Sequence, residues 1–173
     1  MRIVGGKYAG RDLTSPSDFR VRPTAEKVRA HLLDQLKPNL TGARILDLFA
    51  GTGALGLEAI SRGAVYCDFV ETRPSSLHAL KANVGLLGVA KKCRVYKQDA
   101  VQFAEKLTEQ RWDIAFADPP YNSKMLDRVV AAWQATKFSK ILAIECALGH
   151  PLPSPDYRHT IEDTTVAIYR LAP

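Results

Sequence analysis

The sequence predicts an α/β fold of three layers, in which helices cover both faces of a mostly parallel sheet with one antiparallel strand near its edge. Three observations support this. Apolar segments of strand length alternate along the chain with segments of helical periodicity. A glycine cluster follows the first of these strands and opens a helix. Near the C-terminus, the alternating segments 157–161 and 166–171 flank the polar turn 162–165, which predicts a terminal antiparallel hairpin.

The composition is that of a water-soluble globular chain with a basic balance. The 173 residues are 46% hydrophobic and 24% charged, and the formal net charge is +6, which permits binding to a polyanion. No apolar run is long enough for a membrane span, and the N-terminus lacks a signal-peptide core, so a cytoplasmic protein is expected. The three cysteines form no CxxC pair and the four histidines share no ligand spacing, so neither disulfides nor a metal site is expected.

Residues 1–43 are predicted to form an N-terminal extension. Segments 2–6 and 11–14 are short and β-prone with a turn between them, which predicts a small hairpin. A helix is expected to begin with Thr24 as its N-cap and to end at Pro38. Basic residues of one sign gather in this extension, as nucleic-acid backbones favour, although single ones such as Lys27 also suit a solvated helix face. The predicted RNA-contacting residues are Arg2, Lys7, Arg11, Arg20, Arg22 and Arg29.

The main domain, predicted as residues 44–173, begins with an apolar strand over 44–49. The glycines at 51, 53 and 56 fit G-x-G-x-x-G between a strand and a helix that runs to about residue 62. Glycines there allow close approach of a ligand to the backbone. The next strand, 65–70, ends in Glu71, at a position where an acidic side chain accepts hydrogen bonds from ribose hydroxyls. Thr72 and Pro74 then open another helix.

Two further strands lead to polar residues. The third strand, 93–96, precedes Asp99 and Ala100, where Asp99 suits a helix N-cap and a contact to an adenine amine. The fourth, 114–117, is apolar without alternation, as expected of a strand buried on both faces. A helix over 125–135 and a strand over 140–146 follow, and Glu145 near the end of that strand could face either the site or solvent.

The fourth strand ends in Asp118-Pro119-Pro120-Tyr121. Neither proline can donate to a strand ladder, so the sheet stops here and the turn is stiff. The Asp118 carboxylate and the Pro119 carbonyl together suit a group with two N–H donors, such as an exocyclic amine, and the Tyr121 ring suits stacking on a flat base. The alternative is an ordinary strand-ending turn with a capping aspartate.

Asp47 argues against a dinucleotide at the glycine loop. A carboxylate near the end of the first strand would repel a pyrophosphate, whereas it suits a cofactor with cationic groups. S-adenosylmethionine has an ammonium and a sulfonium group and no phosphate. A nicotinamide-dependent oxidoreductase would leave both Asp47 and Asp118 unexplained.

The segments Asp47–Gly53, Glu71, Asp99-Ala100 and Asp118–Tyr121 resemble the ordered motifs of Rossmann-like class I S-adenosylmethionine-dependent methyltransferases that act on exocyclic amines. Segments 2–11 and 22–29 narrow the resemblance to the RsmD family, which methylates a guanine N2 in bacterial 16S ribosomal RNA. The chain departs from the family pattern at 30–32, 144–146 and 163–165. The resemblance implies catalytic residues Asp118, Pro119, Pro120 and Tyr121, and cofactor-binding residues Asp47, Phe49, Gly51, Thr52, Gly53, Glu71, Thr72, Asp99 and Ala100.

The expected activity is therefore methyl transfer from S-adenosylmethionine to a guanine N2 of 16S ribosomal RNA, free or within a small-subunit assembly particle, by a monomeric enzyme without a metal. Two alternatives stay open. Asp-Pro-Pro-Tyr also suits the N6 amine of adenine in DNA or RNA, and a noncatalytic RNA-binding protein could use the same scaffold.

Overall fold

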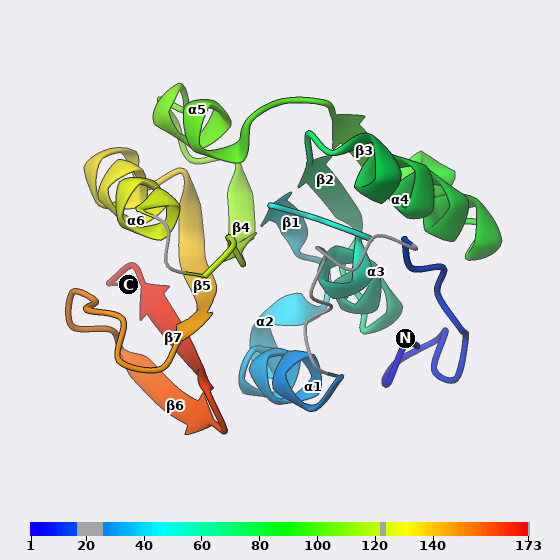
Figure 1. The fold of residues 1–173 in the computed structure, drawn as a ribbon, viewed down its shortest axis with the longest axis horizontal. Coiled ribbons are helices and arrows are strands. Elements are labelled where there is room, and N and C mark those ends of the chain that lie inside the picture. The colour runs from blue at the N-terminus through cyan, green and yellow to red at the C-terminus, as the bar shows by residue number, and fades with distance from the viewer. Residues whose placement is uncertain (17–25, 122–123, 173) are drawn as a thin grey trace.

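The computed structural model describes residues 1–16, 26–121 and 124–172. Within these ranges the seven strands form one sheet in the order β3-β2-β1-β4-β5-β7-β6 (Figure 1). The strands are β1 (Arg44–Leu48), β2 (Tyr66–Val70), β3 (Cys93–Tyr96), β4 (Trp112–Ala117), β5 (Ser139–Ala147), β6 (Tyr157–Ile161) and β7 (Thr164–Arg170). The helices are α1 (Glu26–Gln35), α2 (Lys37–Leu40), α3 (Ala54–Ser61), α4 (Pro74–Leu86), α5 (Ala100–Glu105) and α6 (Met125–Thr136), with a 3₁₀ turn at Ala90–Lys92.

The sheet has the predicted topology. Strands β1 to β5 pair in parallel, and β7 runs antiparallel to both β5 and β6. The predicted α/β class with one reversed strand near the edge is therefore confirmed, as is the terminal hairpin. Strand β7 begins two residues earlier than expected, because the turn needs only Glu162 and Asp163.

Two hydrophobic clusters cover the two faces of the sheet. Residues of β4 alternate between them: Ile114 and Phe116 pack with α1, α3 and α4, whereas Ala115 and Ala117 pack with α5 and α6. Because both faces are covered, β4 has no polar side and its sequence need not alternate. This arrangement places the carboxyl ends of β1, β2, β4 and β5 along one edge of the sheet.

The N-terminal hairpin is smaller than predicted. A single antiparallel bridge joins Arg2 to Asp12, and the segment also docks on the end of α3. The Lys7 N–H donates to the Ser61 carbonyl at 2.8 Å, and at Gly6 a Cβ would lie 2.0 Å from that same carbonyl oxygen. Ile3 and Leu13 belong to the cluster that contains α1, α3 and β1, so the extension and the main domain share one core. The boundary at residue 43 stays a prediction.

One helix boundary differs from the prediction. Helix α1 ends at Gln35, and Pro38 then lies in the first turn of the short helix α2 instead of only ending the preceding one. Proline is tolerated in a first helical turn because the N–H that it lacks has no partner inside the helix. The predicted N-cap Thr24 lies outside the described residues. Across the described ranges, no helix has the length and apolar character needed to cross a membrane.

Candidate active site

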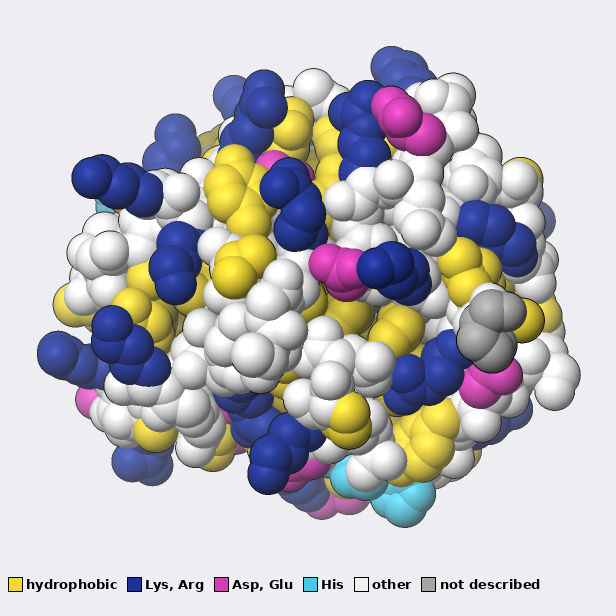
Figure 2. Space-filling model, turned by 180° about the vertical axis from the view of Figure 1, so that it is seen from behind, with side chains coloured by type: hydrophobic (Ala, Val, Ile, Leu, Met, Phe, Trp, Pro, Cys, Tyr) yellow, Lys and Arg dark blue, Asp and Glu magenta, His cyan; other side chains and the backbone are white. Residues whose placement is uncertain are grey.

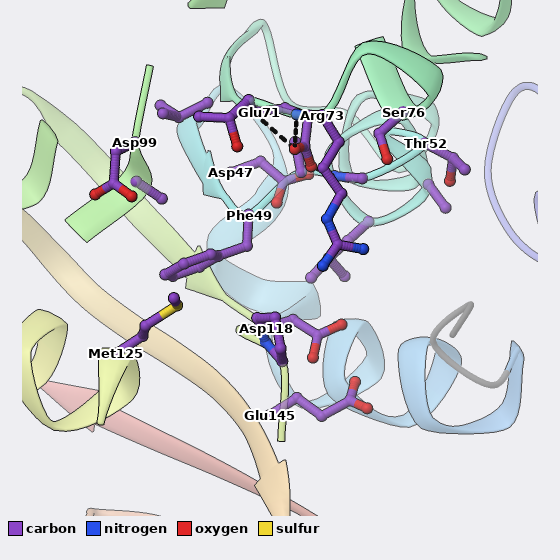
Figure 3. A pocket seen from close by; sticks show the side chains of 18 of the residues that line it. Asp47, Phe49, Thr52, Glu71, Arg73, Ser76, Asp99, Asp118, Met125 and Glu145 are labelled. Carbon is purple, nitrogen blue, oxygen red and sulfur yellow. Dashed lines mark hydrogen bonds between the residues drawn. The ribbon is translucent and has the colours of Figure 1, made fainter. Parts of the chain in front are cut away.

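A cavity of about 410 Å³ opens at the carboxyl ends of β1, β2, β4 and β5. Ligands bind at this edge in open α/β sheets. Most of the predicted catalytic and cofactor-binding residues line it together: Asp47, Phe49, Gly51, Thr52, Glu71, Thr72, Asp99, Ala100, Asp118, Pro120 and Tyr121. Residues separated by more than 70 positions in the sequence are therefore gathered around one space (Figure 3).

Asp47 is the most deeply buried carboxylate of this cavity, with 3% of its surface exposed. Its Oδ2 accepts a hydrogen bond from the Gly56 N–H at 3.0 Å. A Cβ at position 56 would lie 2.9 Å from that oxygen, so the third glycine of the motif allows α3 to approach β1. Burial, together with the nearby charges of Asp118 and Glu71 and against the effect of the Gly56 hydrogen bond, raises the pKa of Asp47 to about 7. A cationic ligand would favour the ionised form.

Glu71 organises the loops around the cavity. Its Oε2 accepts from the Gly51 N–H at 2.8 Å, and its Oε1 accepts from the N–H groups of Thr72 and Arg73, each at 2.7 Å (Figure 3). An ionised carboxylate has about four lone-pair sites, so one remains for a hydroxyl group of a ligand. The Gly51 N–H therefore stabilises the loop by its bond to Glu71 and is not directed at a ligand.

The other glycines of the motif serve packing. Gly53 has φ +79°, and a Cβ there would lie 2.3 Å from Leu80 Cδ1. Its N–H donates to the Ala50 carbonyl at 2.7 Å. Gly53 is not among the residues that line the cavity, so its position favours support of the loop over contact with a cofactor. Because the N–H groups of Gly51, Gly53 and Gly56 all have partners within the protein, they do not form an anion cradle.

An apolar wall faces these carboxylates. Phe49 has φ +61°, an uncommon backbone conformation for a residue with a side chain, and its ring lies next to Met125 of α6 (Figure 3). Asp99 caps α5 by accepting from the Gln102 N–H at 2.8 Å, as predicted, and it also lines the cavity. A flat apolar surface with an acceptor beside it suits an adenine ring.

The turn after β4 forms the outer rim. Asp118 is half-buried and Pro120 is exposed, whereas Pro119 is buried and does not line the cavity with its neighbours. The Tyr121 hydroxyl lies 2.7 Å from Thr164 Oγ1 and donates to Glu145 Oε1 at 3.3 Å. These contacts anchor the far end of the ring to β5 and β7, which fixes the ring at the mouth of the cavity.

The lining residues that sequence reasoning missed or left undecided include Arg73, Ser76, Met125 and Glu145. Glu145 is 6% exposed and lies on the cavity, which answers the question left open above. Figure 3 shows the Arg73 guanidinium pointing from the loop after β2 toward the carboxylates of Asp118 and Glu145. The only signal in the sequence was position, because Arg73 follows Glu71 and Glu145 lies at a strand end.

The cavity fits an adenosine cofactor with cationic groups. Ser76 is 1% exposed and lines the cavity, and its Oγ has no hydrogen-bond partner among the described residues, as expected of a group that a ligand satisfies. Asp47 and Glu71 add negative charge beside it. No cluster of side chains suited to a metal ion occurs in the described ranges.

The predicted RNA-contacting residues divide into three groups: exposed residues, residues outside the described ranges, and the buried Arg29. Arg2, Lys7 and Arg11 are exposed on the N-terminal segment, and Lys7 Nζ lies 5.5 Å from the centre of the Tyr8 ring. Arg20 and Arg22 lie outside the described residues.

The prediction for Arg29 is wrong. Its side chain is 0% exposed, its Nε donates to Glu58 Oε2 at 2.7 Å, and its Nη2 donates to the Arg2 carbonyl at 2.6 Å. Arg29 therefore ties α1 to α3 and to the N-terminal segment, and it has no surface to offer to RNA. The helical periodicity placed it off the apolar face, but a carboxylate on another helix covers that side.

The chain is similar to known methyltransferases over nearly its whole length. It matches the family described as "Conserved hypothetical protein 95" over residues 1–161. "Ribosomal RNA small subunit methyltransferase D" of Escherichia coli K12 is 38% identical over 180 residues, which cover 99% of this chain and 88% of that protein.

Solved structures of other methyltransferases have the same fold as this chain. The Escherichia coli protein yhhF has a TM-score of 0.86 at 28% identity, covering 98% of this chain and 97% of that chain. An RNA methyltransferase from Salinibacter ruber, solved in complex with S-adenosyl-L-homocysteine, has a TM-score of 0.69 at 16% identity over 86% of this chain and 93% of that chain, a likeness of fold alone. The resemblance inferred from the motifs is confirmed: the chain belongs to the "Conserved hypothetical protein 95" family, the RsmD family of methyltransferases.

Proposed function

We propose that this protein transfers a methyl group from S-adenosylmethionine to the exocyclic N2 amine of a guanine in 16S ribosomal RNA. The observation that supports the chemistry most strongly is the position of Asp118. It stands on the rim of a cavity whose interior holds the buried Asp47, and the anchored Tyr121 ring lies beside it. An acceptor for an amine thus shares one space with a site suited to a cation.

The glycine loop favours S-adenosylmethionine over a dinucleotide. The N–H groups of Gly51, Gly53 and Gly56 are directed at Glu71, Ala50 and Asp47, so a pyrophosphate would meet carboxylates there in place of donors. Glu71 is placed for a ribose hydroxyl and Ser76 Oγ for a polar group of the ligand. Bound S-adenosylmethionine would supply a methyl group on a positively charged sulfur.

The residues of the rim would activate the amine. The lone pair of an exocyclic amine is delocalised into the base, which makes the nitrogen a poor nucleophile. In the proposed mechanism the amine donates a hydrogen bond to the Asp118 carboxylate, which favours the pyramidal, reactive nitrogen and fixes its direction. As the new N–C bond forms, Asp118 or a water molecule accepts the proton that the nitrogen loses.

The choice of ribosomal RNA rests on the relatives. The Escherichia coli relative is named for the small ribosomal subunit RNA and covers nearly the whole chain. The exposed Arg2, Lys7 and Arg11 near the cavity-lining Met1 suit a phosphate backbone. The N6 amine of adenine is the second candidate, because the Asp-Pro-Pro-Tyr turn suits both amines.

Ligand-dependent melting tests the cofactor. S-adenosylhomocysteine at saturating concentration is expected to raise the melting temperature by several degrees, since it binds only the folded protein, and NAD is expected to leave it unchanged. Stabilisation by NAD without stabilisation by S-adenosylhomocysteine would contradict the proposal.

A further inference from the structure

Asp118, directly after β4, and Glu145, near the end of the paired strand β5, lie side by side. Strands β4 and β5 are parallel, and Ala117 pairs with Ile144, so the next residue of each strand is a carboxylate. The side chains preceding them on the same face, Phe116 and Ala143, both belong to the hydrophobic cluster on the α1 and α3 side. Both carboxylates line the cavity, and Figure 3 shows them pointing the same way.

The Glu145 carboxylate is held in place. It is 6% exposed, and its Oε1 accepts a hydrogen bond at 3.3 Å from the Tyr121 hydroxyl, which in turn contacts Thr164. The ring proposed to stack on the target base is thus connected to Glu145 by its own hydroxyl. A base stacked on Tyr121 would therefore have this carboxylate near its edge.

We propose, resting on the function above, that Glu145 accepts a hydrogen bond from N1–H of the target guanine and thereby selects guanine over adenine. The Watson–Crick edge of guanine presents N1–H directly beside the N2 amine. These two neighbouring donors match the two neighbouring carboxylates, with the amine at Asp118 and N1–H at Glu145. Adenine presents its N6 amine beside N1, which is an acceptor. The adenine N1 lone pair would meet the buried Glu145 carboxylate, and a buried acceptor facing another acceptor is strongly disfavoured.

The proposal is tested with 2-aminopurine, which keeps the 2-amine of guanine but has no hydrogen on N1. Small-subunit particles are reconstituted with 16S RNA carrying guanine or 2-aminopurine at the methylated position, and kcat/KM is measured for both. For the wild-type protein, 2-aminopurine is expected to lower kcat/KM by about 10- to 100-fold, the usual effect of losing a hydrogen bond to a charged group.

The variant Glu145→Gln relaxes the selection, because its amide can donate to N1 of 2-aminopurine as well as accept from N1–H of guanine. The guanine to 2-aminopurine ratio is expected to fall at least tenfold relative to wild type. Loss of O6 in 2-aminopurine affects both proteins alike and cancels in this comparison. The control Glu162→Gln makes the same chemical change on the exposed end of the terminal hairpin and is expected to keep the wild-type ratio.

The outcomes separate the two proposals. Failure of the wild-type protein to methylate guanine particles would overturn the proposed function. Methylation of guanine with an unchanged base ratio in Glu145→Gln would overturn the role of Glu145 alone. If Glu145→Gln does not fold, equal kcat/KM of the wild-type protein for guanine and 2-aminopurine would overturn the role of Glu145.

Discussion

Asp118 is the residue on which the proposed chemistry depends most directly. Asp118→Asn keeps the size of the side chain but removes the charge and the proton acceptor. We expect kcat to fall by about 10²- to 10⁴-fold, the usual contribution of a positioned acid or base. S-adenosylhomocysteine affinity should change less than threefold, because the side chain is half-buried at the rim and not within the cofactor part of the cavity.

Single-turnover methyl transfer and calorimetric titration measure these two quantities separately. A parallel loss of turnover and of cofactor affinity would show that Asp118 supports cofactor binding, which would contradict its assignment to the amine.

Asp47 makes cofactor binding pH-dependent. Its pKa of about 7 in the unliganded protein means that the carboxyl is largely protonated below neutrality. A cationic ligand favours the ionised form, so S-adenosylmethionine affinity should rise with pH up to about 7 and then level off. Below pH 7 the change approaches about tenfold per pH unit. Calorimetry in two buffers of different ionisation enthalpy should detect the released proton at pH 6.5.

The control Asp47→Asn should bind more weakly and show no such pH dependence below neutrality. The same pKa has a consequence for folding. Because it lies above the unfolded value, the contribution of Asp47 to stability is fully present below pH 4 and is lost as pH rises through about 7. An S-adenosylmethionine affinity that is constant from pH 5.5 to 7.5 in the wild-type protein would contradict the proposed role of Asp47 in cofactor binding.

At the scale of elements, a buried ion-pair network joins α1, α3 and the N-terminal segment. Glu58 of α3 accepts from Arg29 at 2.7 Å and from Arg62 Nη2 at 2.9 Å, and the side chains of Arg29 and Glu58 are both 0% exposed. Removal of Arg29 takes away one of the two cations that compensate the fully buried Glu58 carboxylate. Arg29→Met should lower the free energy of unfolding by about 3–5 kcal/mol, measured by urea denaturation.

The matched control is Lys27→Met on the same helix. Lys27 pairs with Glu162, but the two side chains are 52% and 69% exposed, so the change should be below about 1 kcal/mol. Equal effects of the two substitutions would contradict the structural role of Arg29. Reduced RNA affinity in a fully stable Arg29→Met protein would restore the original prediction.

The elements show why most of the fold could be predicted from the sequence. The strands over 93–96 and 114–117 are continuous apolar or β-prone segments, and their place before Asp99 and Asp118 marks the edge where ligands bind. The N-terminal docking could not be predicted in this way. It depends on contacts such as Lys7 with Ser61, which join residues far apart in the sequence and leave no periodic pattern.

The site was predictable to the extent that its residues follow strand ends. Glu71, Asp99 and Asp118 follow strand ends, Asp47 is the penultimate residue of β1, and all four line the cavity. Ser76 and Met125 lie on helices, and only the packing of α4 and α6 against the sheet brings them to the cavity. For Arg29 the prediction failed in the opposite direction. Its charge suggested a surface position, but its buried partner Glu58 on another helix holds the side chain in the interior.

At the scale of the whole molecule, the formal net charge of +6 suits attraction to a polyanion. Figure 2 shows one face on which Lys and Arg side chains outnumber acidic ones. The exposed Arg2, Lys7 and Arg11 extend this basic character along the N-terminal segment. Each phosphate contact changes the slope of log K against log salt concentration by about 0.7–0.9.

Replacement of Arg2, Lys7 and Arg11 by alanine should therefore weaken binding to 16S RNA at low salt and make its salt dependence shallower by about 2 in that slope. Filter binding over a salt series measures both. The control replaces Lys106, Arg111 and Lys137, which are exposed near the start of β4 and the ends of α5 and α6. An equal change of slope in both triple variants would mean that total charge, and not the N-terminal segment, governs RNA binding.

The central claim is most directly tested by transfer of labelled methyl from S-adenosylmethionine. Small-subunit particles lacking the modification, free 16S RNA and unmethylated DNA are compared as substrates, and the products are digested to nucleosides. We expect label in N2-methylguanosine from a ribosomal substrate. Label in N6-methyladenine would contradict the guanine assignment, and no label in any substrate despite tight cofactor binding would contradict the proposed enzyme activity.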